Sequence, residues 1–200
     1  MSEAAEAVLV KDAILQPLVQ RIQLPPLSLT DDVYFRLIRA VVYQQLSGKA
    51  AATIFQRFLN LFESEYPNSD HLQALSIEEL RAVGLSRQKA SYIKNIADYF
   101  QAHELFETDW RTWSDEAILN ALTSIKGVGK WTVQMILISA LGRMDVFPVG
   151  DLTIQQCMIQ LYGLESAGRE LKKEMEQIAS HWQPYRTQAC RYLWKWKDEQ

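Results

Sequence analysis

The chain has 200 residues, and 48% of them are hydrophobic, which suits one compact domain or two small lobes that share a core. No uninterrupted apolar run reaches the roughly 18–20 residues of a membrane helix, and the acidic N-terminus lacks the basic segment of a signal peptide. The net charge of −3 argues mildly against a nucleic-acid partner, but binding depends on the local field and not on the average. We expect a protein of the cytoplasm and nucleoid, or of the nucleus in a eukaryote, and charge alone decides nothing about DNA.

The cysteines and histidines do not form a metal-ligand pattern. Cys157 and Cys190 lie far apart in predicted helices, where a cysteine is usually a small buried apolar residue. The three histidines are scattered, and the sequence has no closely spaced group of four cysteines. The sequence therefore predicts neither a zinc site nor an iron–sulfur cluster.

The predicted elements are helical nearly throughout, since no alternating strand pattern of useful length appears. Capping signals mark helix starts at residues 30–32, at the capping box of residues 76–79, at Ser86 and at Ser114. We expect helices at residues 6–19, 33–46, 50–62, 77–83, 86–100, 115–122, 131–141, 152–162, 167–179 and 185–197. The second of these has an apolar face made of Phe35, Ile38, Val42 and Leu46. The predicted fold class is all-α.

The most informative stretch runs from residue 122 to residue 151. Gly127 and Gly129 free the backbone for positive φ and for close approach of another backbone. Because an apolar helix follows, their N–H groups join the unpaired N–H groups of its first turn, where the helix dipole adds positive charge. The result is an anion site suited to phosphate, with Lys130 beside it. The two glycines alone are weak evidence, because they could simply turn the chain between packed helices.

Asp151 follows the apolar helix after a break. Pro148 and Gly150 interrupt regular structure, and Asp151 then begins a new amphipathic segment. An Asp in this place is usually an N-cap. It could also be a carboxylate at the mouth of a cleft, facing whatever the hairpin binds.

These two motifs together resemble the helix-hairpin-helix DNA glycosylase superfamily. Residues 125–132 read IKGVGKWT, and residues 146–151 read VFPVGD after a spacer helix, in the order that the family has. The resemblance implies that the hairpin holds the DNA backbone and that Asp151 is catalytic. It covers roughly residues 30–197.

The resemblance also implies a layout for the chain. We expect a single compact glycosylase domain over residues 1–200, with two helical lobes and a cleft between them. Lobe 1 would span about 30–140 and include the hairpin at 122–132. Lobe 2 would combine the N-terminal helix with about 145–200. Some members carry an additional N-terminal domain, so this chain would be a compact version.

The segment around Gln45 is similar to the one from which these glycosylases insert a side chain into the duplex. A plug of this kind fills the hole that a flipped base leaves. Gln45 is the first candidate and Leu46 the second, although Gln44 and Gln45 could merely cap or solvate a helix end. The predicted DNA contacts are Gly127, Gly129, Lys130, Thr132, Gln45, Leu46, Ser47 and Lys49.

Residues 83–90 resemble the family's second, lesser hairpin-like turn. This signal is weaker than the first. Arg87 and Lys89 could meet phosphate there, or they could be ordinary solvated charges.

The C-terminal aromatics are similar to the alkylation-repair branch, the 3-methyladenine DNA glycosylase II type. In that branch an aromatic near the C-terminus lines the base pocket, and Trp194 matches it, although packing is the usual role of a single Trp. The predicted base pocket comprises Trp131, Trp194, Met135 and Leu152. Met135 and Leu152 stand where the bacterial type has aromatics, which leaves the breadth of substrates open.

The expected chemistry is hydrolysis of the N-glycosidic bond of alkylated purines such as 3-methyladenine and 7-methylguanine. Positive charge develops on the deoxyribose, as in glycoside hydrolysis, and Asp151 would stabilise it and orient or deprotonate water. Alkylation makes the base cationic and a good leaving group, so no strong general acid is needed. An aromatic face would favour such a base by about 0.5–2 kcal/mol.

Trp131 predicts a monofunctional enzyme that leaves an abasic site. Relatives with lyase activity have a Lys at this position that forms a Schiff base with the sugar, and Lys130 is one residue away. The carbonyls of Thr123, Ile125 and Val128 correspond to a site for a structural K⁺ or Na⁺ in the family. No cofactor is required.

Two other functions stay open at this point. A bifunctional glycosylase/lyase for oxidised bases would need an amine nucleophile. A non-catalytic helix-hairpin-helix DNA-binding module would not need Asp151. We expect the partner to be double-stranded DNA that contains alkylated bases, and the protein to be a monomer.

Overall fold

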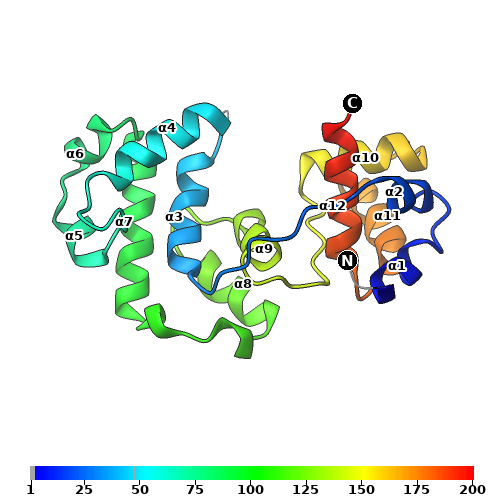
Figure 1. Cartoon of the computed structure of the whole chain (residues 1–200), viewed down its shortest axis with the longest axis horizontal. Helices are drawn as coiled ribbons and strands as arrows, with labels where there is room; N and C mark the ends of the chain where they lie inside the picture. The colour runs from blue at the N-terminus through cyan, green and yellow to red at the C-terminus, as the bar shows by residue number, and fades with distance from the viewer. Residues whose placement is uncertain (1–2, 47) are drawn as a thin grey trace. The chain divides into compact units, whose positions relative to one another are not determined.

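The computed structural model describes residues 3–46 and 48–200, and every regular element in these ranges is a helix (Figure 1). The all-α prediction is confirmed. In the described ranges, none of the helices is both long and apolar enough to cross a membrane. The elements are α1 (Glu3–Leu9), α2 (Gln16–Arg21), α3 (Val33–Tyr43), α4 (Gly48–Leu59), α5 (Ser69–Ala74), α6 (Ile77–Ala82), α7 (Arg87–Ala102), the 3-10 helices η1 (Leu105–Glu107) and η2 (Trp110–Thr112), α8 (Asp115–Thr123), α9 (Lys130–Ser139), α10 (Leu152–Tyr162), α11 (Gly168–Ser180) and α12 (Arg186–Asp198).

The chain divides into two compact units. Leu29–Ile136 forms one, which we call the hairpin unit. Met1–Ser28 and Leu137–Gln200 form the other, which we call the carboxylate unit because it carries Asp151.

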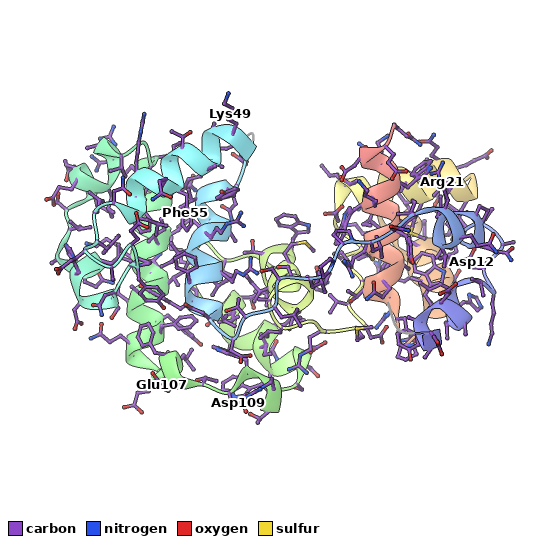
Figure 2. All side chains as sticks on the ribbon, viewed as in Figure 1. Asp12, Arg21, Lys49, Phe55, Glu107 and Asp109 are labelled. Carbon is purple, nitrogen blue, oxygen red and sulfur yellow. The ribbon has the colours of Figure 1, made fainter. Side chains whose placement is uncertain are left out.

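In the hairpin unit, α3 packs against both α4 and α7 (Figure 1). Its buried face includes Leu37, Ile38 and Val41, each fully excluded from solvent. Phe55 of α4 places its ring against those of Phe35 and Tyr43, with centroids 5.5 and 6.0 Å away (Figure 2). Burial of this apolar surface is what stabilises the unit.

In the carboxylate unit, α10 packs against α12 around a separate core. Asp12 ties the N-terminal segment to that core (Figure 2). Its Oδ2 accepts hydrogen bonds from the Tyr162 hydroxyl and the Trp182 indole N–H, each at 2.8 Å. Since Tyr162 ends α10 and Trp182 follows α11, one carboxylate joins three parts of the unit.

The single helix expected at residues 6–19 is wrong, because the structure has α1 and α2 with a turn between them. Asp12 explains the break. Its Oδ1 accepts the backbone N–H groups of Ile14 and Leu15, at 2.9 and 3.1 Å, and these bonds stabilise a turn between the two helices.

The helix expected at residues 33–46 ends earlier, at Tyr43. Leu46 is therefore not part of its apolar face and is 40% exposed. The capping predictions are confirmed for Ser76, Ser86 and Ser114, which cap helices with their side chains, and among residues 30–32 the structure assigns the cap of α3 to Asp32. Helices α5, η1 and η2 were not predicted, because they are too short to show a hydrophobic period.

Candidate active site

Gly127 makes the hairpin turn between α8 and α9 in a backbone conformation that favours glycine. Its φ is +106°, and a Cβ built there would lie 2.2 Å from the ring of Tyr92 on α7. A second contact from α7 fixes the same turn, since Asn95 Nδ2 donates to the Lys126 carbonyl at 3.0 Å. Side chains of α7 therefore contact the hairpin turn at both Lys126 and Gly127.

Gly129 plays a different part from Gly127. Its φ is not positive, so the expectation of positive φ holds only at Gly127. A Cβ at Gly129 would meet nothing within 4 Å, and the residue directly precedes α9, where N–H groups lack partners within the helix. Open space here would let another backbone come close.

A hollow of about 480 Å³ lies at the hairpin. It is lined by Glu116, Thr123, Val128, Gly129 and Lys130, among others. Two of the three residues predicted to offer carbonyls to a cation, Thr123 and Val128, thus share one hollow with the predicted phosphate site. The third, Ile125, accepts the Val128 N–H at 3.0 Å and retains a second carbonyl lone pair.

A second hollow of the hairpin unit, of about 440 Å³, brings together four of the predicted site residues, Gln45, Trp131, Thr132 and Met135. Trp131 is 46% exposed, so its indole can contact a ligand. Thr132 as a whole residue is only 3% exposed, so it lies beneath the surface of this hollow. Trp131 and Lys130, although adjacent in sequence, line different hollows.

The predicted plug residues lie in an exposed turn after α3. Gln45 has a φ of +55°, an unusual value for a residue other than glycine, and Leu46 is exposed beside it. Ser47 lies outside the described residues. Lys49 stands exposed in the first turn of α4 (Figure 2).

Lys89 is not an ordinary solvated charge, because two of its three ammonium donors bind within the hairpin unit. Its ammonium group donates to the carbonyls of Val42 and Gln44, both at 2.7 Å. Arg87 does match the solvated alternative, since it is mostly exposed and forms a 3.5 Å ion pair with the equally exposed Glu78. Sequence reasoning missed the role of Lys89 because its partners are more than 40 residues away in the chain.

Another hollow of the hairpin unit, of about 630 Å³, is larger than these two and contains no predicted site residue. Its lining includes four acidic residues, Asp31, Asp32, Glu107 and Asp109, and one basic residue, Arg111. Figure 2 labels Glu107 and Asp109. This charge would repel phosphate, so size alone does not identify the functional site.

Asp151 is both a buried carboxylate and the N-cap of α10. It is 8% exposed, and its Oδ1 accepts the Ile154 N–H at 2.9 Å. The indole N–H of Trp194, on α12, donates to the same oxygen at 3.2 Å. Leu152 follows with 71% of its surface exposed. Trp194 also packs on the core of the carboxylate unit, as the packing alternative expects, and its place in a base pocket stays a prediction.

The segment that leads to Asp151 is pinned to the start of α12. Arg186 contacts the Asp145 carboxylate with two nitrogens, at 2.6 and 2.9 Å. The Thr187 hydroxyl donates to the Arg143 carbonyl at 2.7 Å and accepts the Val146 N–H at 3.0 Å. These bonds fix the backbone of residues 143–146, which precede Asp151 in the chain.

The two cysteines are buried, as expected, and are not candidates for nucleophilic chemistry. Burial raises the pKa of the Cys157 thiol to about 11. Burial also raises the pKa of Cys190, and the charge of Asp151 adds to that effect. Both thiols therefore stay protonated at neutral pH.

Comparisons with known proteins agree on one family. The model of the HhH-GPD superfamily base excision DNA repair proteins matches residues 38–184. The chain is 37% identical over 166 residues to DNA-3-methyladenine glycosylase 1 of Schizosaccharomyces pombe, covering 81% of this chain and 71% of that protein.

Two solved structures share the fold along nearly the whole chain. The DNA-3-methyladenine glycosidase of Bacillus halodurans superposes with a TM-score of 0.81 at 33% identity, covering 97% of this chain and 88% of the other. The 3-methyladenine DNA glycosylase of Schizosaccharomyces pombe, solved with abasic DNA, gives 0.82 at 35% identity, covering 96% and 95%. The chain belongs to the HhH-GPD superfamily of base excision DNA repair proteins.

Proposed function

We propose that this protein is a monofunctional DNA glycosylase that excises alkylated purines, such as 3-methyladenine and 7-methylguanine, from duplex DNA. The observation that carries the proposal is the Asp151 carboxylate, nearly buried and held by two N–H donors. The names of the relatives support the lesion class, since the Bacillus halodurans and fission yeast proteins are both named as 3-methyladenine enzymes.

The chemistry of Asp151 follows from its setting. Cleavage of the N-glycosidic bond builds positive charge on the deoxyribose, and a fixed carboxylate with little water around it stabilises that charge. The Ile154 and Trp194 N–H groups hold the carboxylate in place, so little reorganisation is needed when the charge appears. The carboxylate can also orient or deprotonate the attacking water.

Trp131 suits an alkylated base. A purine methylated at N3 or N7 carries positive charge, and an exposed indole face attracts such a ring by about 0.5–2 kcal/mol. The same charge makes the base a good leaving group, which removes the need for a strong general acid. Met135 adds a polarizable wall to the hollow that contains Trp131.

Trp131 and Lys130 line different hollows, and this arrangement favours hydrolysis over lyase chemistry. A lyase needs an amine that can form a Schiff base with the sugar. Lys130 lines the hollow at the hairpin, where phosphate is the expected ligand. Trp131 lines a different hollow. An abasic site with intact strands is therefore the expected product.

The hairpin would hold the DNA backbone. The N–H groups at the start of α9 and the charge of Lys130 attract phosphate, and Gly129 leaves room for it. The carbonyls of Thr123, Ile125 and Val128 fit a structural K⁺ or Na⁺, which would supply positive charge to the same phosphate. DNA affinity in potassium chloride should then exceed that in tetramethylammonium chloride at equal ionic strength.

The proposal is tested by base release from duplexes that carry a single 3-methyladenine or 7-methylguanine. Wild type should release free base and leave the strands intact, without a borohydride-trapped complex. Asp151→Asn should lose several orders of magnitude in rate while keeping DNA affinity, because Asn can still accept the Ile154 N–H as an N-cap. Release that survives this substitution would show that Asp151 is not the catalytic residue.

The remaining parts of the proposal concern the oligomeric state and the cellular location of the protein. We expect a monomer that acts where the chromosome lies, in the nucleoid or the nucleus. Light scattering of the purified protein, alone and with one duplex, measures the stoichiometry directly. A two-to-one complex on a single lesion would contradict the monomer.

A further inference from the structure

The side chain of Lys89 connects α7 to the end of α3. Its Nζ lies 2.7 Å from the Val42 carbonyl oxygen and 2.7 Å from that of Gln44. The ammonium group is partly withdrawn from water, and this burial lowers the pKa of Lys89. Both bonds are charge-assisted, which makes them stronger than bonds between neutral groups.

Lys89 binds two carbonyls at the C-terminal end of α3, where the helix has no backbone N–H groups to donate to them. The last carbonyls of an α-helix have no partner within it. Near the end of α3, the Ala40 carbonyl accepts the Gln44 N–H, and the Tyr43 carbonyl accepts the Leu46 N–H. Lys89 serves Val42 and Gln44, and its charge also complements the negative end of the helix dipole.

These bonds determine how the chain leaves α3. The Gln44 carbonyl belongs to the same peptide plane as the Gln45 nitrogen, so fixing the carbonyl fixes that plane. The next residue, Gln45, has a φ of +55°, which is costly for a residue with a side chain and persists only when its surroundings hold it. Lys89 is the side chain that holds the plane next to it.

The same helix that carries Lys89 also holds the hairpin. Tyr92 and Asn95 follow Lys89 at intervals of three residues, so each lies beside the next and the three span about 120° of the circumference of α7. The Tyr92 ring fills the space beside Gly127, and Asn95 binds the Lys126 carbonyl at 3.0 Å. One face of α7 therefore fixes both the hairpin and the turn at Gln45.

We propose that Lys89 is a positioning residue: by holding the carbonyls of Val42 and Gln44, it sets the Gln45–Leu46 turn at a fixed distance from the hairpin, so that the turn enters the duplex while the hairpin holds the backbone. This inference rests on the proposed function, since it requires that a base be displaced from the stack. Lys89 contacts no reacting atom and acts only through the turn.

The test compares Lys89→Met, which keeps the apolar stem and removes the donors, with Lys89→Arg, which retains donors. Arg87→Met is the matched control, because it removes an exposed charge from the same helix turn. Single-turnover excision of 7-methylguanine is measured opposite cytosine and opposite an abasic analogue. The second duplex keeps the phosphate contacts but has no base partner to displace.

Lys89→Met should lose about tenfold in rate opposite cytosine, the factor that corresponds to roughly 1.4 kcal/mol in a barrier, and should keep its rate opposite the abasic analogue. Lys89→Arg should recover part of the loss, and Arg87→Met should match wild type. An equal loss on both duplexes would reduce Lys89 to a general structural residue and overturn the proposal. An unchanged rate opposite cytosine would overturn it as well.

A measurement that does not depend on base excision distinguishes this proposal from the proposed function. A 2-aminopurine next to a stable abasic analogue reports unstacking when the turn enters the duplex. Wild type should raise its fluorescence, and Lys89→Met should raise it less at saturating protein. If wild type releases no base yet the two proteins differ in fluorescence, the proposed function fails and the positioning role stands. Equal fluorescence for the two proteins overturns the role.

Discussion

The indole N–H of Trp194 and the backbone N–H of Ile154 both donate to Oδ1 of Asp151, and the Trp194 bond joins α12 to the first turn of α10. Asp151 is thereby oriented by two different helices. The backbone donor is present whatever the sequence, whereas the indole donor depends on a single side chain. The contribution of Trp194 can therefore be measured on its own.

Trp194→Phe should lower the single-turnover excision rate by about tenfold, because it removes one hydrogen bond to a charged group and keeps an aromatic ring. DNA affinity should change little. Trp196→Phe is the control, since Trp196 packs against the same core. A rate for Trp194→Phe equal to that of Trp196→Phe would show that the indole N–H does not support catalysis.

The two hairpin glycines should respond differently to substitution by alanine. Gly127→Ala should destabilise the protein, because the new Cβ would overlap the Tyr92 ring and the φ of +106° disfavours a side chain. Gly129→Ala should unfold like wild type but bind duplex DNA more weakly, because its methyl group occupies the open space at the start of α9. Thermal unfolding and fluorescence anisotropy measure the two effects. Wild-type DNA affinity in Gly129→Ala would contradict the backbone contact.

Thr187→Val should destabilise the carboxylate unit while preserving its shape. The substitution removes the hydroxyl that binds the Val146 N–H and the Arg143 carbonyl, and the loss at the buried Val146 N–H costs about 1–3 kcal/mol. Urea unfolding measures the loss. Thr53→Val, which removes an exposed hydroxyl from α4, should stay within about 0.5 kcal/mol of wild type. Equal effects of the two substitutions would contradict this account.

Stability should fall in alkaline solution in part through Cys157. Burial raises the pKa of its thiol from 9.0 to about 11, so between these values the folded state keeps a proton that the unfolded state has lost. The contribution is fully present below pH 9.0 and is lost as pH rises through about 11. Urea unfolding of Cys157→Ala should show a shallower decline over this range. Parallel curves for the two proteins would contradict the shifted pKa.

Local signals in the sequence predicted the helix starts and the order of the two motifs well. Ser76, Ser86 and Ser114 cap their helices because the capping bond spans only a few residues. Asp151 heads α10 for the same reason. The same short range explains the family resemblance, since both motifs are continuous stretches of the chain.

Contacts between distant segments could not be predicted in this way. Asp12 breaks the first expected helix while bonding to Tyr162 and Trp182, about 150 or more residues later in the chain. Lys89 is similar, because nothing in its own neighbourhood points to the end of α3. Its spacing from Tyr92 and Asn95 is visible in the sequence, but the partners of that face are not.

Asp151 is at once the proposed catalyst and the cap of α10, and this sets limits on how the protein can lose its activity. Substitution by alanine or leucine would remove turnover and also about 1 kcal/mol of helix capping. Substitution by asparagine, serine or threonine would remove turnover alone. An inactive descendant that still folds and binds DNA should therefore carry one of these three small polar residues at position 151, and such a residue in a related sequence would mark a protein that recognises damage without removing it.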